Sequence, residues 1–174
     1  MSTERRVLLG VLVLVTAVLF WLSECYRVDD LFVVNVFDVD KSLSYRIESA
    51  KFDWYNDEIT EESFPKGFPD YIAGQRLLKL YKCGGDCNSE YVLQLMRADK
   101  SRPATIRELL LFAEKYPHEQ RKYDIVALGS ISRDSPLPPK VAYLDILDHK
   151  RRLRWDLWEG YWPSDTRFLA ISVD

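Results

Sequence analysis

Two cysteines close together are the first residues whose types and spacing could do chemistry. Cys83 and Cys87 flank a Gly-Gly-Asp tripeptide, and apolar residues on both sides predict two strands joined by a tight turn. The two thiols would then face each other near a hairpin tip, which in an oxidising compartment favours a disulfide that fixes the tip. Free thiols and a redox-active pair are the alternatives, but thioredoxin-type motifs separate their cysteines by two residues, whereas three separate this pair.

Aromatic and arginine side chains near the C-terminus predict a contact surface. Trp158, Tyr161 and Trp162 follow Arg152 and Arg154, which alternate with apolar residues and therefore fall on the outer face of a predicted strand. Exposed aromatic residues beside arginine are typical of protein-binding hot spots, and the same composition suits stacking on sugar rings. The alternative is that these aromatic side chains cover the end of the core.

A basic run extends from His149 to Arg154 and could contact an anionic membrane surface or an acidic partner. It falls at a predicted turn between two alternating strands, with Asp145 and Asp148 nearby. Cross-strand ion pairs on a solvated hairpin are therefore the simpler expectation.

An acidic stretch from Asp53 to Glu62 could in principle hold a calcium ion. Calcium loops need oxygen ligands at set spacings and usually a glycine for the turn, and this stretch has neither. We therefore expect a solvated acidic loop.

Motifs of catalysis are absent from the sequence. It contains no Gly-x-Ser-x-Gly elbow, phosphate-binding loop, His-Glu-x-x-His or Gly-x-Gly-x-x-Gly. Its two histidines, His118 and His149, have no nucleophile marked beside them. We predict that the protein is not an enzyme and has no catalytic residue, cofactor or metal site. A hydrolase that uses paired carboxylates remains an alternative, because their spacing exists only in three dimensions.

The N-terminus indicates the compartment. Val7 to Leu22 is an apolar run of sixteen residues behind Arg5 and Arg6. As a helix it would span about 24 Å, somewhat less than the roughly 30 Å of a hydrocarbon core, and interfacial residues would close most of the gap. We expect an uncleaved signal anchor. A cleaved signal peptide and a lipoprotein acylated on Cys25, at the end of an imperfect lipobox, are the alternatives.

The positive charges before this run place the N-terminus in the cytoplasm and the remaining chain outside. In a bacterium the anchor would lie in the inner membrane and the globular part in the periplasm. With 174 residues, 47% hydrophobic composition and a net charge of −3, the chain suits one folded domain and not a nucleic-acid-coating protein. We assign residues 1–28 to the anchor and residues 29–174 to a single extracytoplasmic domain.

The residue pattern of this domain predicts the elements that position these groups. One helix is expected over 103–116, with Pro103 in its first turn and a capping box from Thr105 to Glu108. Period-two patterns predict the strands. The order of elements predicts an α+β fold, mainly antiparallel, with about seven or eight strands in a bent sheet or partial barrel and one packed helix. The expected strands cover 31–39, 43–47, 77–81, 91–96, 125–131, 142–147, 152–158 and 169–173.

These observations together favour a membrane-anchored extracytoplasmic protein-binding module. It would be an accessory subunit of an envelope complex, or an inhibitor or immunity-type protein, and its partner would be another envelope protein and not a nucleic acid. An anchor raises the effective concentration of the domain near a membrane partner. A glycan- or peptidoglycan-binding module and a small periplasmic hydrolase are the alternatives.

Overall fold

The computed structural model describes residues 26–36, 41–65, 74–132 and 138–173. The predicted anchor from Val7 to Leu22 and the thiol of Cys25 lie outside these residues. Within the described ranges, no helix is both long enough and apolar enough to cross a membrane.

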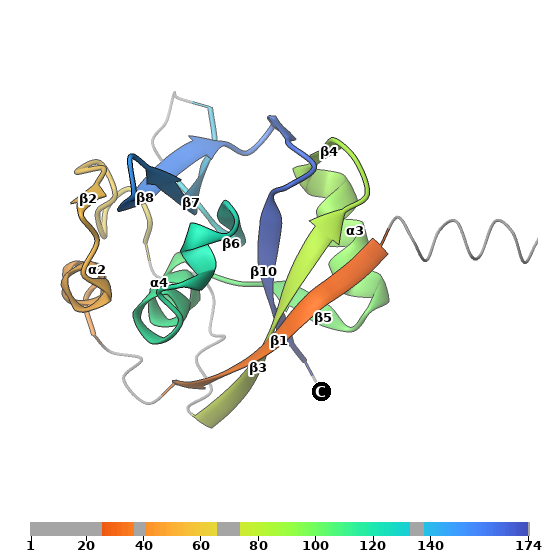
Figure 1. The fold of residues 1–174 in the computed structure, drawn as a ribbon, viewed down its shortest axis with the longest axis horizontal. Coiled ribbons are helices and arrows are strands. Elements are labelled where there is room, and N and C mark those ends of the chain that lie inside the picture. The colour runs from red at the N-terminus through yellow and green to blue at the C-terminus, as the bar shows by residue number, and fades with distance from the viewer. Residues whose placement is uncertain (1–25, 37–40, 66–73, 133–137, 174) are drawn as a thin grey trace, which may run out of the picture.

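A mixed eight-stranded sheet forms the body of the protein (Figure 1). Its order is β1-β3-β10-β6-β7-β8-β2, and β5 pairs with β10 beside that path. The pairs β10–β6 and β2–β8 are parallel, and the other pairs are antiparallel. The strands are β1 (Tyr26–Val36), β2 (Trp54–Tyr55), β3 (Gly74–Cys83), β5 (Ser101–Pro103), β6 (Ile125–Ile131), β7 (Lys140–Leu147), β8 (Lys150–Leu157) and β10 (Arg167–Ser172).

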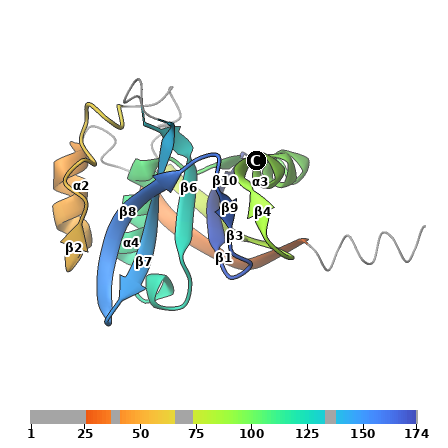
Figure 2. The same ribbon diagram turned by 90° about the horizontal axis from the view of Figure 1, so that it is seen from above.

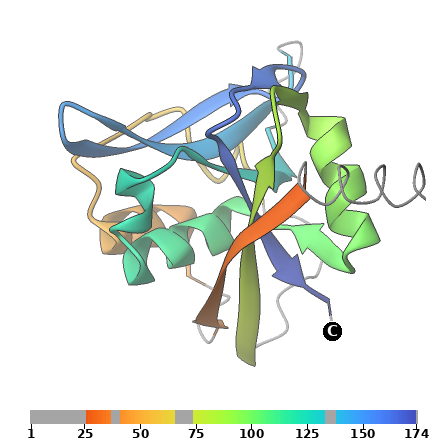
Figure 3. The ribbon, with the colours of Figure 1, turned by 45° about the vertical axis from the view of Figure 1, so that its right-hand side comes forward.

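A second, two-stranded sheet pairs β4 (Cys87–Asn88) with β9 (Tyr161–Trp162). The helices are α2 (Leu43–Ala50), α3 (Ser89–Ala98) and α4 (Ile106–Lys115), with a 3₁₀ turn, η1, at Glu119–Arg121. Figures 2 and 3 show α2 and α4 on one side of the large sheet and α3 on the other. An α+β fold is therefore confirmed, with a sheet that is mostly but not wholly antiparallel.

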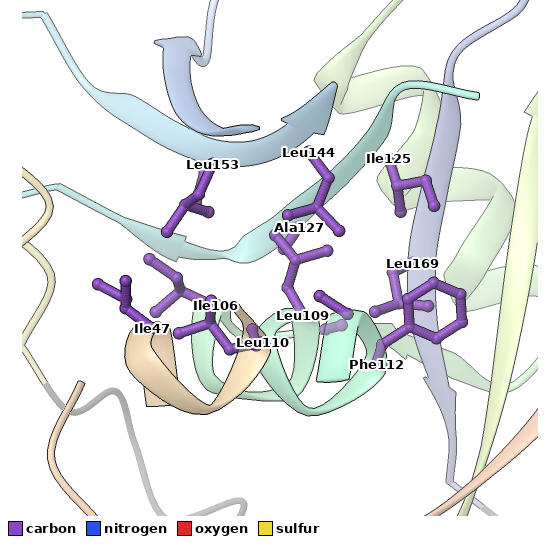
Figure 4. Packing of buried hydrophobic residues seen from close by; sticks show 14 of the residues in the cluster. Ile47, Ile106, Leu109, Leu110, Phe112, Ile125, Ala127, Leu144, Leu153 and Leu169 are labelled. Atoms are coloured by element: carbon purple, nitrogen blue, oxygen red, sulfur yellow. The ribbon is translucent and has the colours of Figure 1, made fainter. Parts of the chain in front are cut away.

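The larger hydrophobic core lies between α4 and the sheet (Figure 4). Leu109 and Leu110 of α4 are fully buried against Leu144 of β7 and Leu153 of β8. The side chains of a strand alternate between the two faces of its sheet. Tyr143, the neighbour of Leu144 in β7, therefore points to the opposite face, where it packs in a second core with Val92 and Met96 of α3.

The predicted helix over 103–116 is confirmed in its body and wrong at its start. The side chain of Thr105 accepts from the backbone of Glu108, and the Glu108 carboxylate accepts from the backbone of Thr105, which completes the predicted capping box. Pro103, however, lies in β5, where it pairs with Ala170 of β10.

Two predicted strands are wrong because both are helices, so the described part of the domain has three α-helices where one was expected. Residues 43–47 belong to α2, whose buried positions Leu43, Arg46, Ile47 and Ala50 follow helical spacing. Residues 91–96 belong to α3, which buries Val92 and Met96 four residues apart. The other six predicted strands correspond to β1, β3, β6, β7, β8 and β10. Strand β1 begins at Tyr26, three residues before the boundary assigned from the sequence.

Candidate functional site

The predicted disulfide joins Cys83, at the end of β3, to Cys87, at the start of β4. Both cysteines are buried, whereas Gly84, Gly85 and Asp86 between them are exposed. The expectation that the bridge lies near the tip of a hairpin between two strands is wrong, because β4 pairs with β9 and the chain then enters helix α3. The bridge therefore fixes a short exposed loop at the junction of a strand and a helix.

The small sheet brings this bridge to the predicted aromatic surface. Cys87 of β4 lies opposite Trp162 of β9, and Asn88 lies opposite Tyr161. Two hydrogen bonds of the Ser89 hydroxyl, at the start of α3, connect the same segments. The hydroxyl accepts from Trp162 Nε1 at 3.0 Å and donates to the Trp158 carbonyl at 2.6 Å. We refer to residues 83–88 and 158–165 together as the tip.

The three predicted aromatic residues have different environments. Tyr161 is 77% exposed, whereas Trp162 is buried edge-on against Tyr143 and Phe168. Trp158 is half-buried against the same core, with no hydrogen-bond partner for its indole Nε1 among the described residues. Trp162 thus follows the alternative in which aromatic side chains cover the core, and Tyr161 alone of the three presents a largely exposed ring.

The two predicted arginines converge on one carboxylate. Asp145 of β7 lies opposite Arg152 of β8, and Arg152 donates to it from Nε at 2.8 Å and from Nη2 at 2.5 Å. Arg154 donates to the same carboxylate at 3.2 Å. The expected cross-strand ion pairs are therefore present. The side chain of Arg154 is 41% exposed, but that of Arg152 is only 17% exposed, so Arg154 is the more accessible of the two.

Arg151, in the middle of the basic run, is not part of any surface. Its side chain points to the side of the sheet that α2 and α4 cover. There it donates to the carbonyls of Ala50 and Ala113 and to Gln120 Oε1. Burial lowers the pKa of this guanidinium below its usual value. The expectation of a fully solvated basic run is therefore wrong at this position.

Tyr143, which the sequence analysis did not select, links the arginines to the tip. The Arg154 guanidinium lies 5.5 Å from the centre of its ring, and the ring contacts Trp162 edge-on. Burial raises the pKa of Tyr143 to about 12, although the charge of Arg154 opposes that shift. Its alternation with the core residue Leu144 was the signal that could have placed Tyr143 on the face of Arg154.

Asp124 precedes β6 and has an unusual acidity. Desolvation of its carboxyl group raises the pKa of Asp124 to about 6, and the negative charges of Asp145 and Asp165 add to that shift. The residue as a whole still contacts solvent. The charges of Arg152 and Arg154 oppose this shift, so Asp124 lies within electrostatic range of the predicted surface.

The acidic stretch is mostly tied to the rest of the protein. Glu58 pairs with Lys140 at 3.1 Å, Glu61 pairs with Arg107, and Asp53 accepts from the backbone of Arg151. The described residues include no group of three or more His, Cys, Asp or Glu side chains that could hold a metal ion. His118 and His149 are both exposed.

A hollow of about 270 Å³ lies between α2 and the segment that follows β2. Figures 1 and 2 place these elements at the end of the sheet away from β4. This hollow could not be expected from the apolar pattern of residues 43–47, which predicted a strand where the structure has α2. Its lining residues are Ser44, Ile47, Glu48, Tyr55, Asp57, Ile59, Thr60 and Glu61.

Comparisons of this chain with protein-family models, with curated proteins and with solved structures find no match.

Proposed function

We propose that this protein is a membrane-anchored, extracytoplasmic protein-binding module whose main contact surface is the tip together with Arg154. Accessory subunits of envelope complexes and inhibitors or immunity-type proteins are the classes that this proposal covers. In both classes the work is recognition of another protein, so the exposed groups carry the function.

The observation that carries the proposal is the exposure of Tyr161 on a fixed scaffold. Its ring is 77% exposed, yet its strand is paired with β4, which begins at the disulfide-bonded Cys87. An exposed tyrosine on rigid backbone binds at low entropic cost, because few torsions must be fixed on binding. Hot spots of protein interfaces are enriched in tyrosine and arginine, which matches Tyr161 and Arg154.

The proposed compartment is supported by two independent features. A buried disulfide between Cys83 and Cys87 suits an oxidising compartment, since cytosolic thiols are usually kept reduced. The apolar run Val7–Leu22 behind Arg5 and Arg6 has the composition of a signal anchor with its N-terminus inside.

Affinity capture with the full chain in mild detergent tests this proposal. A C-terminally tagged chain should retain a stoichiometric protein partner, and Tyr161→Ala should weaken that binding by about tenfold or more, as expected of a hot spot. Leu31→Ala is the control, because Leu31 is an exposed residue of β1 that lies outside the tip and at the opposite edge of the sheet from β2. Capture of no protein, or equal loss with both variants, would contradict the proposal. Binding of cell-wall fragments instead would favour the glycan-binding alternative.

A further inference from the structure

The hollow beside α2 combines an apolar floor, an aromatic wall and a charged rim. Ile47 and Ile59 form the floor and are 5% and 3% exposed. Tyr55 lines the hollow with a ring that is 48% exposed. At about 270 Å³ the hollow lies below the usual range for drug-sized ligands, roughly 300–1,000 Å³, and suits a single long side chain.

Two carboxylates at the rim form no ion pair with any residue that the structure describes. Glu48 of α2 and Asp57 line the hollow and are exposed, and neither forms an ion pair within the described residues. Glu61, which also lines the hollow, differs from them: its carboxylate accepts from Arg107 and from the backbone of Leu43. Among the described residues, the negative charges of Glu48 and Asp57 therefore remain available to a cation at the rim.

The walls are fixed before any ligand arrives. The backbone N–H of Asn56 donates to the Leu153 carbonyl of β8 at 3.0 Å, and the Asn56 side chain accepts from Glu58 at 2.9 Å. The Ser42 side chain caps the start of α2. A preorganised hollow binds with a smaller entropic cost than one that must first order its walls.

We propose that this hollow receives a lysine or arginine side chain from a basic segment of the partner protein. The aliphatic stem would cover Ile47 and Ile59, and the cation would lie against the Tyr55 ring between Glu48 and Asp57. A cation over an aromatic face and beside carboxylates gains from both interactions. The inference rests on the proposed function, because it assigns the occupant to the same partner.

The hollow is a contact separate from the tip. Helix α2 and strand β2 lie at one end of the molecule, and β4 lies at the other (Figures 1 and 2). Simultaneous contact at both ends would raise the overall affinity, because the second contact becomes intramolecular once the first has formed. Substitutions at the two ends should therefore weaken partner binding independently.

A titration of the isotope-labelled full chain in detergent micelles tests the chemistry of the hollow. The probes are the N-acetyl methylamides of lysine and arginine, with that of norleucine as the uncharged control. The two cationic probes should cause saturable NMR shifts at the backbone amides of Tyr55, Asp57 and Ile59, and norleucine should not. Equal shifts with norleucine, or no shift with any probe, would overturn the inference.

Variants of the rim sharpen this test. Glu48→Gln and Asp57→Asn should each weaken binding of the lysine probe about threefold, as expected for exposed ion pairs. Glu62→Gln is the matched control, because Glu62 is an exposed carboxylate of the same segment that does not line the hollow. An equal effect of Glu62→Gln would show that only the general negative charge of the segment matters, which overturns the inference.

Capture of the partner separates this inference from the proposed function. The Glu48→Gln/Asp57→Asn chain should retain the partner more weakly than the wild-type chain. Unchanged retention would overturn the assignment of the occupant and leave the proposed function intact. Capture of no partner by the wild-type chain would overturn the proposed function and the occupant together, whatever the probes do.

Discussion

Cys87 and Trp162 lie opposite each other in the two-stranded β4–β9 sheet. This pairing connects two segments far apart in the sequence, one closed by the Cys83–Cys87 bridge and the other carrying the exposed ring of Tyr161. The bridge therefore constrains the strand next to Tyr161 as well as its own loop.

Removing the bridge should lower stability and loosen the tip. We expect Cys83→Ser/Cys87→Ser to reduce the free energy of unfolding by about 2 kcal/mol, at the low end for disulfides because the closed loop is short. Urea denaturation of the full chain in micelles measures this change. Asp86→Ala, an exposed position in the same loop, should change the value by less than about 0.5 kcal/mol. An unchanged midpoint in the double variant would contradict a structural role of the bridge.

Asp145 should be the critical member of its charge cluster. Asp145→Asn leaves Arg152 and Arg154 close together without a neutralising carboxylate, and we expect a loss of about 2 kcal/mol. This value is below that of a fully buried pair, because Arg154 is partly solvated. Thermal or urea unfolding of the variant measures the loss. The control is Asp148→Asn, at an exposed turn residue with φ of 50°, a conformation that asparagine adopts readily. Equal stability of both variants would contradict the account.

Asp124 should make the stability depend on pH. Its pKa is about 6 in the folded protein against 3.8 for an unperturbed aspartate, so the folded state binds a proton more tightly than the unfolded state. Its contribution to the free energy of unfolding therefore rises as the pH falls from above 6 towards 3.8, and is unfavourable at pH 7.

The variant Asp124→Asn should accordingly be more stable than the wild type at pH 7, and this difference should shrink on acidification. Unfolding curves of both proteins across this pH range measure the difference directly. Asp86→Asn, at an exposed residue of the disulfide loop, serves as the control and should follow the wild type. A difference that is constant with pH would contradict the raised pKa of Asp124.

Arg151 should matter for stability more than its position in a basic run suggests. Its guanidinium donates at 2.9 Å to the carbonyl of Ala50, the last residue of α2, and at 2.9 Å to that of Ala113 in α4. Arg151→Met should cost about 3 kcal/mol, because it leaves buried carbonyls without donors. Its exposed neighbour provides the control, Lys150→Met, which should be close to neutral when both are unfolded in urea. Similar losses in both variants would contradict this assignment.

The sequence predicted the strands better than the helices, for a physical reason. The buried face of α2 includes the charged Arg46. Apolar residues therefore stand at every second position, at Leu43, Tyr45 and Ile47, and this alternation suggests a strand. Helix α3 has apolar residues at most of its positions, but only Val92 and Met96 of them are fully buried, so its buried helical face does not stand out in the sequence. Their N-caps, Ser42 and Asn88, were the available signals.

The candidate site could be predicted only in part, because burial and pairing depend on distant segments. The Cys83–Cys87 bridge followed from its spacing and flanking residues. The burial of Trp162 did not, since it depends on Tyr143 and Phe168, from β7 and β10. The hollow was equally inaccessible, because α2 and Asp57 meet only after the chain has folded.

Site-specific photocrosslinking in intact cells tests the central claim most directly. Tyr161→p-benzoylphenylalanine in the full chain should form one discrete adduct with another protein, because we place the partner against this ring. The same replacement at Leu31, an exposed residue of β1 outside both the tip and the hollow, should not form that adduct. No adduct from position 161, or the same adducts from both positions, would contradict a protein-binding surface at the tip.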